Sequence, residues 1–434
     1  MLLVYSPKNS YRLTYILDLM LKDLLGLSYR VTKDEQEFLL HQGPKFSYAD
    51  KQVDNEPFFY ATSLLFERGI KPQEISVFDW EGSKAFYATH PKYLLPFDAF
   101  AAAFYLVTRY EEYLPHTRDQ YDRFDARQSL AYKKGFLHEP VINRWAQRIG
   151  EILQQQFPTL IIKQHEYRYI STLDIDNAWA YREKGIFRSV GAMLRSLVQF
   201  DMAGLGERLS VVLGRKKDPY DTYDQLESIR ERYNISCIYF FLLGDYGQFD
   251  KNVSASRRKF QSLIKSIADY NLCGIHPSYQ SNEEPHRIAL EQRRLSKVIR
   301  REVTRSRQHF LKLKFPDTYR QLIACDITDD YTMGYAQEIG FRAGICTSFN
   351  FYDLGAEQET TLRIHPFAVM DATLRNYMLL KPDEVLGRVI PMIRATKAVG
   401  GTFMSLWHNE SLSEKHPWEG WQSTYEEIVK AATA

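Results

Sequence analysis

The chain has 434 residues, and its 56 Lys or Arg and 54 Asp or Glu residues give a net charge of +2. This balance argues against a nucleic-acid-binding protein, because such proteins carry an excess of basic residues. The 44% hydrophobic fraction is typical of a globular protein, and the length suits two or three domains. We therefore expect no nucleic-acid partner.

Targeting and redox signals point to the cytoplasm. The first residues lack a basic stretch followed by a long apolar run and a cleavage site, so we expect no secretory signal. No apolar stretch reaches about 18 residues, so we expect no membrane span. The four cysteines show no CxxC spacing, so we expect no cysteine zinc site and a reducing compartment. They are Cys237, Cys273, Cys325 and Cys346.

Residues 1–160 are predicted to form a smaller mixed α/β domain. A strand at Leu2–Tyr5 precedes a helical run from Ser10 to Leu25, and strand-like runs follow. A second helical run begins at Pro96 and stops at Pro115, and a further helix is predicted over Pro140–Gln156. These patterns predict a fold for this domain but no role.

Three charged residues near the end of the second helical run have two interpretations. Arg109, Glu111 and Glu112 are either a polar site or a charged helix end that anchors the next loop. The second interpretation is favoured, because charged residues commonly gather at helix ends.

Residues 161–434 are predicted to form a distorted (β/α) barrel of seven or eight mostly parallel strands. Short apolar runs alternate with longer helical ones, a pattern typical of βαβ units. Residues 180–219 interrupt the pattern and are predicted to be a helical insertion. The predicted strands are Arg168–Asp174, Ser236–Leu243, Leu272–His276, Phe310–Leu313, Ile323–Ile327, Ala343–Ser348, Leu362–Met370 and Thr402–His408.

Two carboxylates stand at the end of the first of these strands. Asp174 and Asp176 are two residues apart, so in an extended strand they face the same way. Two close carboxylates resist joint ionisation unless a cation or a proton lies between them. The pair therefore suggests a metal site, although a solvated loop or a helix N-cap at Asp176 is the alternative.

Histidines follow two other strands. His276 comes directly after an apolar strand and before Pro277, and His408 ends the last strand beside Trp407. Ligands bind at the carboxyl ends of strands in parallel α/β folds, so both histidines would lie on the functional rim. A histidine there can bind a metal or act as a general acid. The alternative is a structural, hydrogen-bonded histidine.

Two further segments place polar residues near the same rim. Arg307 and His309 alternate onto one face, which reaches the site if that face is the barrel interior. Otherwise they belong to a basic cluster at a helix end. Asp330 could orient a neighbouring ring or guanidinium, or cap the helix that is predicted to begin at Tyr335.

Together these residues resemble the NodB-homology, carbohydrate esterase family 4 polysaccharide deacetylases. The resemblance implies that Asp174 is the general base, Asp176 and His276 are metal ligands, and His408 is the catalytic histidine. Arg307-Gln-His309 and Asp329-Asp330 resemble two further motifs, which implies that Arg307 or Asp330 orients Asp174 or His408.

One position departs from the family pattern. The second motif is His-Ser/Thr-x-x-His, and here it reads His276-Pro-Ser-Tyr-Gln280. A glutamine is a poor zinc ligand. Three outcomes are open: His309 acts as the third ligand, which we favour; the metal binds weakly with waters; or the site is a non-catalytic sugar-binding version. The expected cofactor is a divalent metal, with zinc the first choice.

The implied function is a metal-dependent hydrolase that removes an acetyl group from an N-acetylated sugar or polysaccharide. The whole chain also resembles a bacterial group of two-domain proteins of the polysaccharide deacetylase family, through Phe97–Leu114 and Tyr331–Leu354. The first alternative is a degenerate protein that binds carbohydrate through Trp179, Trp407 and tyrosines. The second is a hydrolase of a non-peptide C–N bond in another small amide, as in allantoinase-like relatives.

Overall fold

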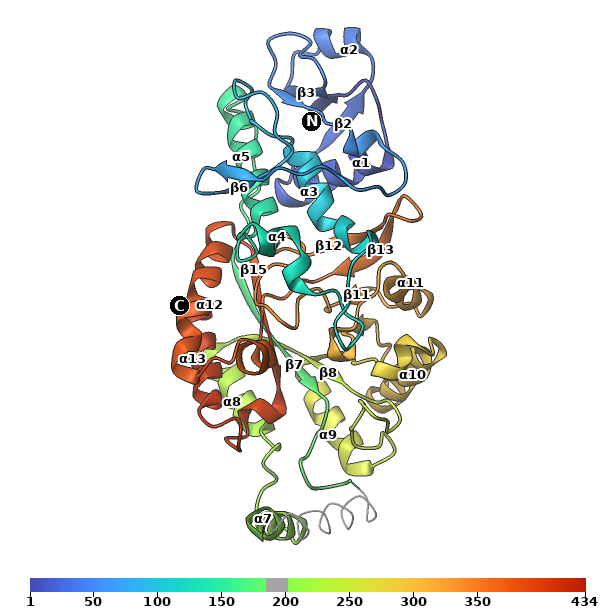
Figure 1. The fold of residues 1–434 in the computed structure, drawn as a ribbon, viewed down its shortest axis with the longest axis vertical. Helices are drawn as coiled ribbons and strands as arrows, with labels where there is room; N and C mark the ends of the chain where they lie inside the picture. Colours follow the sequence, from blue (N-terminus) through green and yellow to red (C-terminus); the bar gives the residue numbers. More distant parts are fainter. Residues whose placement is uncertain (185–201) are drawn as a thin grey trace.

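The computed structural model describes residues 1–184 and 202–434 and contains two sheets built mainly from parallel strands (Figure 1). A four-stranded sheet lies at one end of the molecule, a nine-stranded sheet fills the middle, and α7 (Met202–Val212) lies at the opposite end. Residues 185–201, within the predicted insertion, are outside the described residues. Among the described residues, no helix is long and apolar enough to cross a membrane.

The first sheet lies within residues 1–160, which we call the N-terminal unit, and residues 161–434 are called the second unit. All its pairings are parallel, in the order β2-β1-β3-β4. Its strands are β1 (Leu2–Tyr5), β2 (Tyr29–Thr32), β3 (Lys45–Ala49) and β4 (Phe58–Tyr60), and a separate hairpin pairs β5 (Phe78–Trp80) with β6 (Ser83–Ala85). The helices of this unit are α1 (Tyr11–Leu17), α2 (Glu35–Leu40), α3 (Ala99–Val107), α4 (Leu130–Lys133) and α5 (Val141–Gln156).

Helix α3 joins this unit to the rest of the molecule. All nine of its residues are buried, and Asp98 caps its N-terminus by accepting a hydrogen bond from the Ala101 N–H. Phe100 packs against the first sheet at Phe46, while Phe104 packs against Tyr352 of the second sheet. One hydrophobic core therefore runs through both parts of the chain, and the division at residue 160 stays a prediction.

The second sheet has the order β12-β13-β11-β10-β9-β8-β7-β15-β14, and every pairing except β12–β13 is parallel. Its strands are β7 (Arg168–Ile175), β8 (Ser236–Phe241), β9 (Leu272–Ile275), β10 (Arg305–Ser306), β11 (Asp329–Asp330), β12 (Phe349–Asp353), β13 (Gln358–Ile364), β14 (Val369–Met370) and β15 (Thr402–His408). Besides α7, its helices are α8 (Tyr223–Tyr233), α9 (Arg258–Ala268), α10 (His286–Ile299), α11 (Asp317–Ala324), α12 (Pro382–Ala398) and α13 (Trp421–Thr433).

This sheet curls around a small apolar cluster. Phe240 of β8, Met404 of β15 and Phe367 before β14 belong to the same cluster, although β8 and β14 are not neighbours. Within the described residues no pairing joins the edge strands β12 and β14, so a closed barrel is not shown. The fold is a mixed α/β fold with a mostly parallel sheet of nine strands, rather than seven or eight.

Three strand predictions were wrong. Phe310–Leu313 overlaps a 3₁₀ turn, Ile323–Ile327 begins in α11, and Ala343–Ser348 is irregular. In α11 the apolar residues follow a helical period, which a short window mistakes for a continuous run. The strands that take these places in the sheet, β10 and β11, have two residues each and are too short to leave a hydrophobic signal.

Candidate metal centre

The carboxyl ends of neighbouring parallel strands bring the predicted site residues together. Asp174 lies in β7 and Asp176 directly follows it, while His276 directly follows β9. His309 follows β10, which pairs with β9. With His408, these residues line one cavity of about 270 Å³. The strand-end rule therefore located the region of the candidate site.

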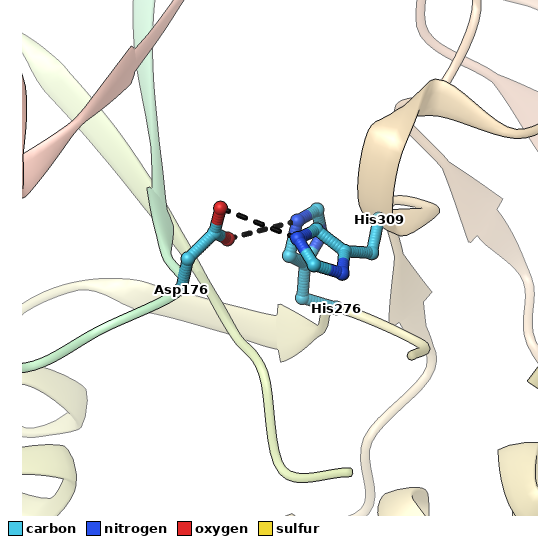
Figure 2. Close-up of side chains that lie close together, drawn as sticks. All are labelled: Asp176, His276 and His309. Atoms are coloured by element: carbon cyan, nitrogen blue, oxygen red, sulfur yellow. Dashed lines mark ion pairs between the residues drawn. The ribbon is translucent and has the colours of Figure 1, made fainter. Parts of the chain in front are cut away.

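Asp176, His276 and His309 form a compact group (Figure 2). Asp176 Oδ1 lies 3.3 Å from His276 Nε2, and Asp176 Oδ2 lies 3.3 Å from His309 Nε2. One oxygen or nitrogen of each residue lies within 4.8 Å of the others. A single ion can be reached by all three side chains.

The other nitrogen of each imidazole ring has an acceptor. His276 Nδ1 lies 2.6 Å from the Arg307 carbonyl oxygen, and His309 Nδ1 lies 2.9 Å from Asp250 Oδ1. Carbonyl and carboxylate oxygens accept hydrogen bonds, so each Nδ1 is the donor. In the neutral rings both Nε2 lone pairs then face Asp176, as in metal-binding histidines held by an outer hydrogen bond.

Gln280 does not belong to this group. Its side-chain Nε2 donates to Glu284 Oε1 at 2.7 Å, and its backbone N–H lies 3.4 Å from Asp250 Oδ2. Gln280 thus helps to hold Asp250, which in turn holds His309. His309 supplies the third donor atom of the group.

Contacts within the group shift the pKa values of Asp176 and His309 in opposite directions. Asp176 Oδ1 is buried and receives no hydrogen bond from the residues that the structure describes. Burial disfavours its charge, but His309, His276 and His408 hold the pKa of Asp176 well below its usual value. Burial likewise opposes the charge of His309, but Asp176 and Asp250 raise its pKa to about 9. One carboxylate and two imidazoles are a donor set that suits zinc and similar divalent ions.

Asp174 is held from behind by Arg307. Arg307 is fully buried, and its Nη1 donates to Asp174 Oδ1 at 3.0 Å and to Thr172 Oγ1 at 2.7 Å. Its guanidinium carbon lies 4.6 Å from the centre of the Phe240 ring. The second oxygen, Asp174 Oδ2, lies 3.6 Å from His276 Nε2, on the side of the three-residue group.

His408 is paired with an aspartate that the sequence analysis missed. Asp371 accepts hydrogen bonds from His408 Nδ1 at 2.8 Å and from the His408 backbone N–H at 2.7 Å. Burial opposes protonation, but Asp371 and then Asp176 raise the pKa of His408 well above its usual value. His408 Nε2 lies 3.9 Å from Asp176 Oδ2, so this edge of the ring faces the group of Asp176, His276 and His309.

Other residues of interest lie elsewhere. Asp330 accepts hydrogen bonds from the Thr332 N–H at 2.9 Å and from Thr332 Oγ1 at 2.8 Å, and it does not line the cavity. Trp407 and Trp179 are buried and pack against Tyr425 and Phe260, respectively, so they are core residues and not a sugar-binding surface.

The sequence analysis did not anticipate several residues in and around the cavity. Asp371 directly follows β14, so the strand-end rule would have found it. Asp250 lies in the loop after β8, where no local pattern marks it. The cavity itself is lined by Tyr121 and Arg123 of the N-terminal unit and by Tyr377 and Trp418, whereas Asp371 and Asp250 lie behind the lining histidines.

Comparison with protein-family models gives one match, which covers residues 2–158 and is described as a family of unknown function (DUF7033). No curated protein matches the sequence. The family match covers less than half of the chain and implies no activity.

Solved structures give distant likenesses. A candidate polysaccharide deacetylase from Mycobacterium smegmatis is 13% identical, with a TM-score of 0.39, and the match covers 63% of this chain and 85% of that one. A mutant of a CE4-family pseudoenzyme with restored enzymatic activity is 10% identical, with a TM-score of 0.26 and coverages of 62% and 64%. A 7,8-dihydropteroate synthase from Vibrio fischeri ES114 is 9% identical, with a TM-score of 0.29 and coverages of 62% and 92%. These values are too low to assign a function.

Proposed function

We propose that this protein is a metal-dependent hydrolase that removes the acetyl group from an N-acetylated sugar or polysaccharide. The observation that carries the proposal is the three-residue donor group of Asp176, His276 and His309. Asp174 and His408 flank this group in the same cavity, which matches the need of amide hydrolysis for a base and an acid.

The proposed roles follow from the free atom of each side chain. Asp176, His276 and His309 would hold a divalent ion, which supplies polarisation of a carbonyl and a lowered pKa of water. Asp174 takes the proton of the attacking water at Oδ2, because Arg307 occupies Oδ1. His408, kept protonated by Asp371, donates from Nε2 to the leaving nitrogen. Acetate and an amine result.

The cavity wall supports a sugar as substrate. Tyr377, whose side chain is exposed, lines it together with Asn376. Aromatic rings offer the apolar face on which a pyranose packs, and neighbouring polar groups bind its hydroxyls. This combination favours an N-acetylated sugar over a compact cyclic amide.

The test is metal content together with acetate release. Purified protein is loaded with Zn²⁺ and dialysed, its bound metal is measured, and acetate release from N-acetylglucosamine oligomers is followed. We expect about one ion per chain, and we expect Asp176→Ala and His276→Ala to abolish both binding and activity. His365→Ala is the matched control, because His365 also pairs with an aspartate, Asp329 at 2.7 Å, but lies outside the cavity lining.

Two results would contradict the proposal. If wild-type protein holds no metal and releases no acetate from any N-acetyl sugar, the proposed enzymatic function is wrong. If it binds sugar equally well with and without a chelator, and still releases no acetate, it is a carbohydrate-binding protein. Release of product from small cyclic amides would instead move the substrate class away from sugars.

A further inference from the structure

A loop of the N-terminal unit reaches the cavity of the second unit. Residues 114–129 run from the end of the 3₁₀ turn after α3 to the start of α4. Within this loop, Tyr121 and Arg123 line the same cavity as His309. The loop carries none of the ligand or proton-transfer groups described above, so its contacts indicate another role.

The turn that follows His309 has a strained backbone. Phe310 and Leu311 both have left-handed conformations, with φ of 60° and 54°, and neither is a glycine. Side-chain-bearing residues rarely adopt this conformation, and consecutive ones persist only where surrounding contacts hold them. His309 is joined directly to these two residues, so their conformation fixes the position of its backbone.

Arg123 holds this turn through its guanidinium group. Its Nη1 donates to the Phe310 carbonyl oxygen at 2.9 Å, and its Nη2 donates to the Tyr377 hydroxyl at 2.9 Å. Asp119 pairs with Arg123 at 2.7 Å and accepts a further hydrogen bond from Gln337 at 2.7 Å. Arg123 is only 5% exposed, so its position is set from several sides.

Tyr121 holds the same turn by ring packing. Its ring centroid lies 4.9 Å from that of Phe310 and 6.1 Å from that of Phe249. Phe249 precedes Asp250, the acceptor of the His309 Nδ1–H bond. Tyr279 packs against Phe249 at 4.5 Å, and its backbone N–H donates to Asp250 at 2.9 Å. These aromatic contacts therefore hold Phe310 and Phe249, the chain neighbours of His309 and of its hydrogen-bond partner.

We propose that Tyr121 and Arg123 are positioning residues for His309, so that the N-terminal unit is a working part of the metal centre. They act by holding the left-handed turn at Phe310 and the Asp250 loop, which together orient the His309 ring. The inference rests on the proposed metal site, and it assigns a role to the part of the chain that matches a family of unknown function.

The test uses the full chain and Co²⁺ alone, whose visible absorption reports its ligands. We expect Arg123→Ala to weaken Co²⁺ binding about 10- to 100-fold, which is usual when an outer contact of a metal ligand is lost. Its spectrum should shift toward that of His309→Ala. The matched control is Arg127→Ala, from the same loop, because Arg127 is exposed and pairs with Asp125. It should keep wild-type affinity and spectrum.

Milder variants keep the test decisive if Arg123→Ala does not fold. Arg123→Lys removes the forked contact, and Tyr377→Phe removes one acceptor of Arg123; both should weaken binding in the same direction by smaller factors, with unchanged circular dichroism. Folded variants that all bind Co²⁺ with wild-type affinity and spectrum would overturn this inference and leave the proposed function standing. A wild-type protein that binds no Co²⁺ would overturn the proposed function, and this inference with it.

Discussion

Two clusters of buried charged residues lie in different regions of this molecule, and they differ in whether their charges are neutralised within the cluster. At the interface between the units, Glu112 accepts hydrogen bonds from Arg109 Nε at 2.8 Å and from Arg342 Nη2 at 2.6 Å. Arg109 also donates to the Arg342 carbonyl oxygen and, at 2.8 Å, to the Tyr335 hydroxyl. Burial disfavours the charge of Glu112, but Arg342 and Arg109 lower its pKa.

In the candidate metal centre, by contrast, a buried oxygen has no hydrogen-bond partner among the described residues. Asp176 faces two imidazole nitrogens whose other nitrogens are already hydrogen-bonded, and its Oδ1 receives no hydrogen bond from the described residues. Buried polar atoms are normally satisfied, so each exception calls for an explanation. A cluster whose charges satisfy one another anchors two parts of a fold, whereas one that leaves converging donor atoms free is suited to a ligand. Arg109 and Glu112 thus join two parts of the fold, whereas the sequence favoured a charged helix end that anchors the next loop.

The largest effect is expected at the acid of the proposed reaction. His408→Ala should lower kcat for acetate release by about 10²–10⁴, the usual contribution of a general acid. Bound metal should stay at the wild-type level, because His408 lies outside the three-residue donor group. Steady-state kinetics and metal analysis on the same preparation check this. Loss of the metal together with activity would make His408 a ligand.

The next effect concerns the interface cluster. Glu112→Ala should lower the free energy of unfolding by about 3–5 kcal/mol, because the buried Arg342 loses its carboxylate and Arg109 keeps only Glu111. Urea unfolding gives the value. Glu139→Ala is the control: its pair with Arg144 is partly exposed, so its loss should cost at most about 1 kcal/mol. Similar losses for the two variants would show that the buried cluster is not an anchor.

The smallest effect concerns a buried carboxylate with no cation within ion-pair distance among the described residues. Glu291 of α10 is 2% exposed and accepts hydrogen bonds from the Ser278 N–H and Oγ–H at 2.9 and 2.6 Å. Burial raises its pKa to about 7, from 4.5 when unfolded. The folded chain binds this proton more tightly, so the stability contribution is complete below about pH 4.5. It is lost as the pH rises to about 7.

The pH dependence should disappear in a variant that does not titrate. The wild-type loss is up to about 3.5 kcal/mol, since one pKa unit is worth about 1.4 kcal/mol. Glu291→Gln should lack this decline, so the stability difference between the two proteins should change between pH 5 and pH 8 in favour of the variant. Urea unfolding across this range measures it, and parallel stability curves would refute the assignment to Glu291.

Long, strongly patterned elements were predictable from the sequence, and short ones were not. The helices Tyr223–Tyr233 and Pro382–Val399 and the strands Arg168–Asp174 and Thr402–His408 were predicted within one residue at each end. Strand β10 precedes Arg307 and His309, yet it has two residues and leaves no hydrophobic run. The same reason hid β11.

The sequence by itself determined which side chains stand at strand ends: Asp174, Asp176, His276 and His408 follow apolar runs, and parallel strands present such residues at one edge. Only the tertiary structure decided which groups hydrogen-bond to these side chains and line the cavity around them. Asp250 comes from a loop and Asp371 from the helical turn after β14, both distant in sequence from their histidines, and Tyr121 and Arg123 come from the other unit. Local periodicity reports burial within one element, whereas the partners of a buried charge are set by how separate elements pack.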